Sequence, residues 1–269
     1  ARGQLGRSLA LTCPPGLDGD VVWADRSLLD VTDTAAVVAS PVLEAADVVL
    51  NCAAFTDVDG AEEEPGRTLA EAANATAPGL IARRCADVGA RLVHVSTSPE
   101  TFDGRTKLAG ERAALAACPA TTVVRTAWVY SGDTLPEHRD FVSTMLRLAR
   151  RGVDPKVVDD QFGSPTYAPD LARALWRLVL DGDGAASGTA GARPAAGRVL
   201  HGVGAGWTSW HLLAREVFAA AGFDPERVSP VDTAGYPTKA KRPRWSVLAA
   251  DLELPEWRTG VARAVAARL

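Results

Sequence analysis

The chain has 269 residues, which is enough for one large core or for a main domain with a smaller satellite. Its 29 basic and 33 acidic residues leave a net charge of −4, and no block of like charge is long enough to indicate nucleic-acid binding. The sequence has no apolar stretch of membrane-spanning length and no basic-then-apolar leader, so it predicts neither a membrane span nor a signal peptide. Four scattered cysteines without a C-x-x-C spacing favour reduced thiols in the cytoplasm over disulfides or a zinc site.

The first element is a glycine turn that leads into a helix. In "ARGQLGRSLA", Gly3 and Gly6 would complete a G-x-x-G-x-x-G pattern if one more glycine preceded Ala1. Such glycines let the backbone approach a pyrophosphate, which the amides at the start of the helix then bind. A plain turn before a surface helix explains two glycines equally well.

The next segment, "VVWADRSLLDVTD" at 21–33, predicts a short strand that ends at Asp25 and Arg26. A dinucleotide site places an acid here for a free ribose 2′-hydroxyl, or an arginine for a 2′-phosphate, so NAD and NADP both stay open. Asp30 and Val31 would fall beside the adenine, although Asp30 could equally cap the next helix. A sheet of this kind needs a strand before the glycine turn, and we expect that strand to be missing from the sequence given.

Strands and helices then alternate. The runs at 47–54, 90–97 and 121–130 are β-branched and almost continuously apolar, as expected of strands buried on both faces of a parallel sheet. Between them, 68–89 and 106–118 read as helices, the first with a C-cap at Gly89. The alternation predicts an α/β fold with a doubly wound parallel sheet.

The composition changes after residue 150. A loop and helix at 157–180, a Gly/Ala-rich flexible loop at 181–197 and an amphipathic helix at 209–222 follow one another. We therefore expect a dinucleotide-binding domain over 1–150. Residues 151–269 should form mainly a smaller substrate-binding lobe, with some segments that return to the sheet.

Eight segments, in this order, resemble the dTDP-4-dehydrorhamnose reductase family of extended short-chain dehydrogenases/reductases. They are "LNCAAFTDVDGAEEEP", "NATAPGLIARRCADVGARLVHVST", "GRTKLAGE", "VVRTAWVYSG", "FVSTMLRLAR", "VVDDQFGSPTYAPDLARAL", "YPTKAKRPRWSVL" and "LPEWRTGV". The resemblance covers nearly the whole chain. It implies NADPH-dependent reduction of the 4-keto group of a dTDP-linked 6-deoxysugar, with a Rossmann domain for the cofactor and a C-terminal lobe for the sugar nucleotide. NADH stays possible as the cofactor. We expect a monomer or homodimer without a metal, and the charge and hydropathy give no reason to expect nucleic acid or a membrane as a partner.

The resemblance also implies the roles of individual residues. The catalytic positions match Thr97 and Lys107, with Asp103 at the place of the family's tyrosine. The cofactor positions match Gly3, Gln4, Leu5, Gly6, Asp25, Arg26, Asp30, Val31, Ala53, Ala54, Phe55 and Lys107. The substrate positions match Trp128, Asp160, Gln161, Thr166 and Arg242, an arginine being suited to a diphosphate because its planar fork binds two oxygens.

The sequence departs from the family's pattern at several points. Phe55 stands where Tyr or His is more common, and Ser98 replaces the acid of the "STD" triplet. The substrate-covering loop of roughly twenty residues that should follow Ser98 is absent. Structural roles also compete with functional ones: Trp128 could be core, Thr97 an ordinary strand residue and His94 a satisfied interior histidine, and the seven tryptophans form no box.

The departure with the largest chemical consequence is Asp103, four residues before Lys107. Ketone reduction needs a proton donor near the carbonyl oxygen, and an aspartate beside a lysine is an anion that has no proton to give. The pair could also be a plain i, i+4 ion pair, or Asp103 could cap the helix. Three hypotheses follow: a reductase with an unusual acid, a cofactor-binding homologue that acts as a regulatory subunit, or a related sugar-nucleotide epimerase or reductase.

Overall fold

A parallel sheet of four strands forms the centre of one half of the molecule. The computed structural model describes residues 2–17, 19–98, 101–180 and 197–267. The strands follow the order β1-β2-β3-β8, and all neighbours are parallel. Their bounds are Val48–Asn51 (β1), Arg91–Ser96 (β2), Thr121–Arg125 (β3) and Arg198–His201 (β8). The three apolar runs of the sequence therefore form strands as predicted.

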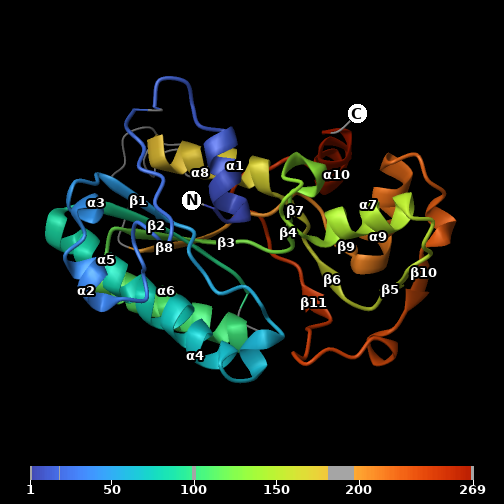
Figure 1. Cartoon of the computed structure of the whole chain (residues 1–269), viewed down its shortest axis with the longest axis horizontal. Helices are drawn as coiled ribbons and strands as arrows, with labels where there is room; N and C mark the ends of the chain where they lie inside the picture. Colours follow the sequence, from blue (N-terminus) through green and yellow to red (C-terminus); the bar gives the residue numbers. More distant parts are fainter. Residues whose placement is uncertain (1, 18, 99–100, 181–196, 268–269) are drawn as a thin grey trace.

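Helices cover both faces of this sheet (Figure 1). On one face α5 (Ala77–Val88) and α6 (Phe102–Ala117) bury Ile81 and Ala114 against Leu92 of β2. On the other face α1 (Gln4–Leu11) and α8 (Ala168–Leu180) pack against Val93 and Val124. Layers on both sides make this the predicted doubly wound α/β fold, and they explain why the strands are apolar throughout.

The segment before β1 differs from the prediction. Residues 21–25 have no strand structure, so the expected strand ending at Asp25 and Arg26 is wrong. Among the described residues, β1 has β2 as its one sheet partner. An extended segment becomes a strand only when a neighbouring strand accepts and donates its backbone hydrogen bonds, and residues 21–25 belong to none of the sheets in the described part of the chain. The short helices α2 (Thr34–Val38) and α3 (Pro41–Glu44) follow.

The helix predicted over 68–89 is present but divided. It comprises α4 (Gly66–Ala70), a π-helical turn (Glu71–Thr76) and α5, and it ends at Gly89, whose φ of 77° is the left-handed cap that glycine adopts readily. The predicted helix over 106–118 corresponds to α6, which begins four residues earlier, at Phe102. Short 3₁₀ turns occur at Gly60–Glu62, Gly132–Thr134, Pro225–Arg227 and Thr233–Gly235.

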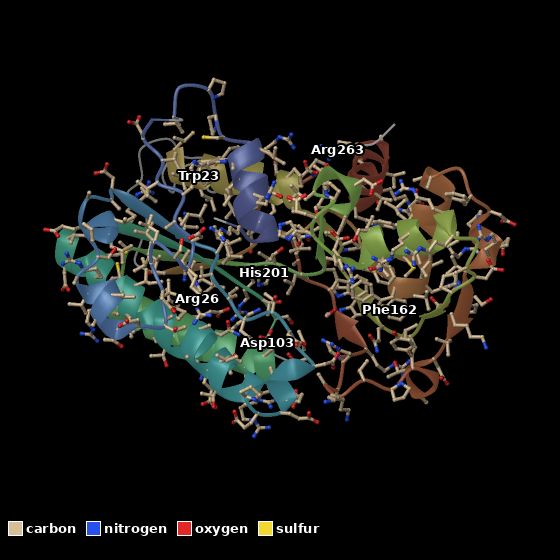
Figure 2. All side chains as sticks on the ribbon, in the orientation of Figure 1. Trp23, Arg26, Asp103, Phe162, His201 and Arg263 are labelled. Atoms are coloured by element: carbon tan, nitrogen blue, oxygen red, sulfur yellow. The ribbon has the colours of Figure 1, made fainter. Side chains whose placement is uncertain are left out.

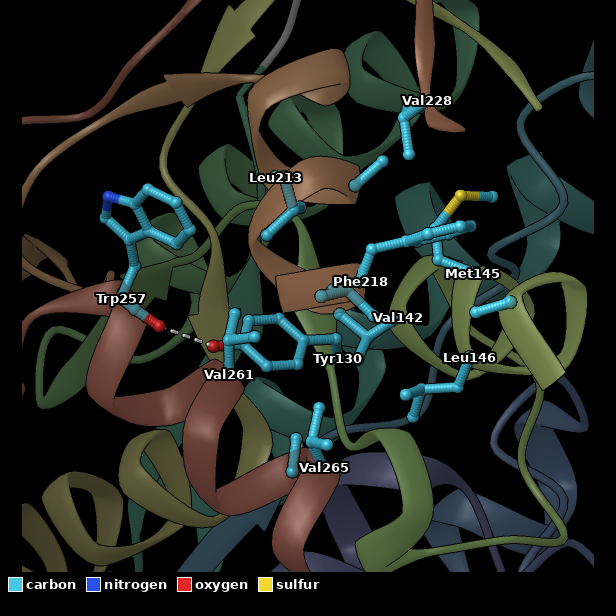
Figure 3. Close-up of a cluster of buried hydrophobic side chains, with 14 of the residues drawn as sticks. Tyr130, Val142, Met145, Leu146, Leu213, Phe218, Val228, Trp257, Val261 and Val265 are labelled. Atoms are coloured by element: carbon cyan, nitrogen blue, oxygen red, sulfur yellow. Dashed lines mark hydrogen bonds between the residues drawn. The ribbon is translucent and has the colours of Figure 1, made fainter. Parts of the chain in front are cut away.

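A second core lies in the other half of the molecule. It joins α7 (Phe141–Arg150), α9 (Trp210–Ala220) and α10 (Trp257–Ala266), and Figure 3 shows it around Tyr130, whose hydroxyl donates to the Trp257 carbonyl at 2.9 Å. Three small sheets accompany these helices: β5 with β10, β4 with β7, and β6 with β9 and β11. Their strands are Val129–Tyr130 (β4), Lys156–Val158 (β5), Phe162–Gly163 (β6), Thr166–Tyr167 (β7), Thr208–Ser209 (β9), Ser229–Val231 (β10) and Trp245–Ser246 (β11).

Two segments of the second half of the sequence lie with the first core: β8 pairs with β3, and α8 packs against α1. The Gly/Ala-rich loop predicted at 181–197 falls, except for Gly197, outside the described residues. No helix within the described ranges is both long and apolar enough to cross a membrane.

Candidate active site

A cleft of about 2150 Å³ runs between the two halves of the molecule. The start of α1, the ends of β1 and β2, the start of α6 and parts of the second half line it. It brings together sixteen of the residues predicted from the sequence: Gly3, Gln4, Leu5, Gly6, Asp25, Arg26, Asp30, Val31, Ala53, Ala54, Thr97, Asp103, Lys107, Trp128, Gln161 and Arg242. Arg26 and Asp103 lie on the side of α5 and α6, whereas Phe162 lies in the other half (Figure 2).

Three predicted residues lie outside the lining of the cleft: Phe55, Asp160 and Thr166. The Asp160 carboxylate accepts hydrogen bonds from the backbone and hydroxyl of Thr233. Thr166 is fully buried, and its hydroxyl donates to the Ser164 carbonyl. Their contacts are with protein groups, and a role toward a ligand stays a prediction.

The start of α1 has the chemistry of an anion site. Gly3 is the N-cap and supplies no side-chain cap, and the first turn contains no acidic residue. A Cβ at Gly3 would meet nothing within 4 Å, so the space beside the turn is open. The first backbone N–H groups of a helix have no partner within the helix, and they carry the positive end of its dipole. This donor set fits a pyrophosphate.

Gln4 points its side chain toward the second half. Its amide donates to the Ser131 hydroxyl at 3.0 Å and to Asp140 Oδ2 at 2.9 Å. Asp140 is the N-cap of α7, so this contact ties the glycine turn to the helix that begins at Phe141. The backbone of Gln4, rather than its side chain, is therefore what the turn offers to a bound anion.

A polar cluster from Asp25 to Asp30 lies beside the turn. The hydroxyl and the backbone N–H of Ser27 donate to Asp25 and lower the pKa of its carboxyl from 3.8 to about 2, so Asp25 is a carboxylate acceptor at neutral pH. Arg26 Nε donates to Asp30 Oδ2 at 2.9 Å, while the Arg26 side chain stays 75% exposed. A carboxylate and an accessible guanidinium therefore stand next to each other, and their roles toward a ribose and a 2′-phosphate stay a prediction.

Lys107 and Asp103 form an ion pair at the start of α6. Lys107 Nζ lies 3.2 Å from Asp103 Oδ2, and Asn74 Nδ2 donates to Asp103 Oδ1 at 2.9 Å. Thr101, not Asp103, caps the helix, through a hydrogen bond from the Gly104 N–H. Of the two structural roles considered for Asp103, the i, i+4 pair is confirmed and the cap is wrong.

Asn74 was missed by the sequence reasoning. It is buried in the π-helical turn, and besides Asp103 it exchanges hydrogen bonds with the backbone N–H and carbonyl of Phe55. The available signal was a lone amide inside the alanine-rich stretch "EAANATAPG". Asn74 therefore links α6, the Asp103 carboxylate and the loop that follows β1.

Thr97 follows the end of β2, and its hydroxyl donates to the Thr126 carbonyl at 3.0 Å. Trp128, two residues after Thr126, has a left-handed backbone with a φ of 46°. Its ring stacks on Trp210, with the centroids 3.5 Å apart and the planes at 11°. Six of the seven tryptophans form separate pairs, and Trp128 with Trp210 is one of two pairs that line the cleft. Phe141 lines the cleft beside them, and nothing in the local sequence of Trp210 or Phe141 indicated it.

On the far wall, Arg242 Nη2 lies 2.9 Å from Asp59 Oδ2, a contact between the two halves of the chain. Gln161 donates to the Thr233 hydroxyl at 3.1 Å. Arg242 keeps further N–H donors on a fork suited to phosphate oxygens.

The phenols of Tyr130 and Tyr167 are hydrogen-bonded to protein groups and lie outside the lining of the cleft. Tyr130 is buried, and burial raises the pKa of its phenol. The Tyr167 hydroxyl bonds to that of Thr134 at 2.7 Å. Tyr236 lines the cleft and is 56% exposed.

The remaining titratable groups near the sheet favour structural roles. Burial lowers the pKa of His94 from 6.5 to about 4, and its Nδ1 bonds with Asn51 at 3.1 Å. All four cysteines are free, and burial raises the pKa of the Cys85 thiol to about 12. No group of three metal-ligating side chains occurs within the described part of the chain.

Comparison with known proteins identifies relatives along the full chain. A family model described as "RmlD substrate binding domain" matches residues 1–98 and 97–269. The chain is 43% identical to the dTDP-4-dehydrorhamnose reductase of Mycobacterium tuberculosis, an alignment that covers 99% of this chain and 91% of that protein. The crystal structure of a dTDP-4-dehydrorhamnose reductase from Clostridium acetobutylicum superimposes with a TM-score of 0.82 and 32% identity, over 98% of this chain and 95% of that one. The corresponding protein from Bacillus anthracis, in complex with NADP, gives a TM-score of 0.81 and 30% identity, over 97% and 94%.

The alignments also concern the substrate-covering loop that the sequence lacks after Ser98. The alignment with the M. tuberculosis protein spans 297 positions against the 269 residues of this chain, so that relative has residues without a counterpart here. The two segments matched by the family model meet at residues 97–98, next to the point where the sequence lacks the expected loop.

Proposed function

The chain belongs to the dTDP-4-dehydrorhamnose reductase family, and we propose that it reduces the 4-keto group of a dTDP-linked 6-deoxysugar with NADPH. As a member of this family it is an NAD(P)H-dependent oxidoreductase. The observation that carries the proposal is similarity along nearly the whole chain to enzymes named for this reaction. Fold alone would not be sufficient, because one fold hosts many functions.

The donor set at the start of α1 supports NADPH as the cofactor. The first-turn amides would hold the pyrophosphate, the Asp25 carboxylate a ribose hydroxyl and the exposed Arg26 guanidinium the 2′-phosphate, which favours NADPH over NADH. When bound, the cofactor supplies the hydride. The walls formed by Asp30, Val31, Ala53 and Ala54 would enclose the adenosine and nicotinamide ends.

Lys107 would hold the cofactor ribose, and Thr97 would act beside the sugar carbonyl. Lys107 has three N–H donors, of which one faces Asp103, so two remain for ribose hydroxyls. The Asp103 carboxylate accepts hydrogen bonds from Lys107 and Asn74, so we assign the proton to water. The Thr97 hydroxyl oxygen would accept a hydrogen bond from this water and hold it beside the sugar carbonyl, while its own O–H donates to the Thr126 carbonyl. The water would give its other proton to the carbonyl oxygen and regain one from solvent. We expect the reaction to be slower with water as the proton donor than with a positioned phenol as the general acid.

The far wall would take the dTDP-sugar. Trp128 and Gln161 would contact the sugar nucleotide, and Arg242 its diphosphate, while Asp160 and Thr166 would support this wall from behind. In this proposal residues 1–150 hold mainly the cofactor and residues 151–269 mainly the substrate. The free cysteines agree with a cytoplasmic enzyme, and a monomer or a homodimer would serve equally.

One observation favours a second function. Asp103 stands at the position of the expected phenol and is held by Lys107 and Asn74. A chain that binds NADPH and a sugar nucleotide without reducing it would be a regulatory homologue.

The decisive experiment follows NADPH absorbance with a dTDP-4-keto-6-deoxysugar generated in situ. The proposal expects NADPH oxidation that requires the keto-sugar and is lost in Lys107→Ala. Binding of NADPH and dTDP without any oxidation would replace the reductase by the regulatory homologue. Absence of dTDP binding would reject the substrate class altogether.

A further inference from the structure

We propose that Trp210 is a positioning residue that fixes Trp128 in the substrate wall and thereby sets the affinity for the sugar end of the substrate. This inference rests on the proposed function, because it takes a sugar nucleotide as the ligand of that wall. Trp210 is the first residue of α9 and lines the cleft from the second half of the chain.

Three aromatic rings from separate elements form this part of the wall. Trp210 stacks on Trp128 with centroids 3.5 Å apart, and the Phe141 ring lies 4.7 Å from Trp210 at an interplanar angle of 52°. All three line the cleft. The two indoles lie face to face in van der Waals contact, which restricts how either ring can turn relative to the other.

The backbone of Trp210 is itself held in place. The Ser209 side chain accepts from the Leu212 N–H at 3.1 Å and caps α9, and it donates to Asp159 Oδ1 at 2.5 Å. Trp210 is therefore a fixed element against which another ring can be positioned.

Trp128, in contrast, is in a conformation that it does not adopt readily. A bulky residue at a φ of 46° is strained and persists only when its surroundings impose the conformation. Gly163 leaves the required room, because a Cβ there would lie 2.3 Å from Cε2 of the Trp128 ring. The Trp128 carbonyl accepts from the Thr166 N–H at 3.1 Å. Stacking on Trp210 adds the contact that holds the side chain against the wall.

The strained loop is connected to the reacting region. The Thr126 carbonyl accepts the hydroxyl of Thr97, and Thr126 lies two residues before Trp128. A shift of the Trp128 backbone would therefore move the group that orients Thr97. Trp210 acts on the substrate through Trp128, so we assign it a positioning role and not a catalytic one.

The wall suits the sugar of the proposed substrate. A 6-deoxyhexose presents a methyl group and C–H faces, which pack favourably against flat apolar rings. Without Trp210, the Trp128 ring would lose its fixed orientation. We expect the KM for the keto-sugar to rise about threefold to tenfold, as an aromatic pair of typical strength implies.

The test compares Trp210→Leu, Trp210→Phe and the matched control Trp245→Leu. Trp245 is 54% exposed, packs on Trp207 and lies outside the lining of the cleft. Near-UV circular dichroism reports the coupling of the stacked indoles, and kinetics report KM separately for keto-sugar and NADPH. We expect Trp210→Leu to lose the coupling signal and raise the keto-sugar KM, with the NADPH KM unchanged. Trp210→Phe should restore most of the affinity. Trp245→Leu should change the near-UV spectrum, because Trp245 packs on Trp207, but should keep the wild-type KM for both keto-sugar and NADPH.

Unchanged keto-sugar KM and kcat in Trp210→Leu, with the coupling signal gone, would overturn the proposal. If Trp210→Leu does not fold, the test uses Trp210→Phe. In that variant, a rise in the KM for NADPH equal to the rise in the KM for the keto-sugar would also overturn the proposal. If wild type shows no turnover, the proposed function fails, and titration with dTDP-rhamnose tests the wall alone. Weaker binding by Trp210→Leu then supports the positioning role, whereas equal binding, or no binding by wild type, rejects it.

Discussion

Asp103 Oδ2 lies 3.2 Å from Lys107 Nζ, one helical turn apart on α6, and the two side chains are only 3% and 12% exposed. The carboxylate stands where the family resemblance places a phenol, and it is held from the other side by Asn74. Its contacts make it an acceptor that orients the lysine. This arrangement decides how the proton of the reduction is supplied.

The first prediction concerns this pair. Wild type should turn over slowly, because general acid catalysis contributes about 10²–10⁴-fold and a relayed water recovers only part of it. Asp103→Tyr should accelerate the reaction. Asp103→Asn should leave kcat almost unchanged, because it removes no proton donor, but it should lower the melting temperature, since Lys107 then lacks its ionic partner.

NADPH absorbance and thermal unfolding measure these outcomes, and Tyr236→Phe is the matched control. If Asp103→Asn abolishes an ordinary turnover of about 1–10³ per second, Asp103 is the acid. If Tyr236→Phe abolishes it instead, the exposed phenol of Tyr236 is the donor and the water relay is wrong.

The second prediction concerns cofactor choice. Arg26→Ala should weaken NADPH by about 10-fold to 100-fold, the cost of a lost charge-assisted hydrogen bond, and leave NADH nearly unaffected. Titration of nucleotide fluorescence measures both affinities. Arg258→Ala, an exposed arginine on α10 outside the cleft, is the control. Equal losses for both nucleotides would show that Arg26 does not read the 2′-phosphate.

The third prediction concerns the diphosphate. Calorimetry should detect dTDP binding that Arg242→Ala weakens by about 1.5–3 kcal/mol, because a charge-assisted hydrogen bond is lost. Arg244→Ala, two residues along the chain and outside the lining of the cleft, should bind as wild type. A loss of the same size in Arg244→Ala would mean that general positive charge, not the Arg242 fork, attracts the nucleotide.

The fourth prediction concerns pH. Burial lowers the pKa of His94 from 6.5 to about 4, so between these values the unfolded chain binds one more proton than the folded chain. The free energy of unfolding should therefore rise with pH across this window by about 1.4 kcal/mol per pH unit. The contribution, about 3 kcal/mol in total, is complete above pH 6.5 and lost as pH falls through 4.

Urea unfolding at a series of pH values measures this contribution. In His94→Leu, the free energy of unfolding should depend less on pH between 4 and 6.5 than in wild type. It should also be lower by a constant amount at every pH, because Asn51 loses its hydrogen-bond partner. His201→Leu controls for the removal of one histidine. A slope unchanged in His94→Leu would mean that His94 is not the group responsible.

The elements that the sequence predicted are those whose signal is local. Continuous β-branched runs specified β1, β2 and β3, and Gly89 specified the end of α5, because side-chain periodicity and backbone freedom act within a few residues. Spacing on one helix likewise brought Asp103 and Lys107 together. The resemblance then supplied candidate site residues, and sixteen of the nineteen predicted residues line the cleft.

Tertiary structure decided the features that depend on partners distant in the chain. Residues 21–25 form no strand because a strand needs a neighbour to complete its hydrogen bonds, however favourable its own residues are. Asn74 reaches Asp103 across 29 residues, and Arg242 reaches Asp59 across 183. The stack of Trp128 on Trp210 needed a glycine at 163 and a capped helix at 209 to meet in space. Local patterns carry no information on such meetings, because packing of the whole chain determines which side chains share a wall.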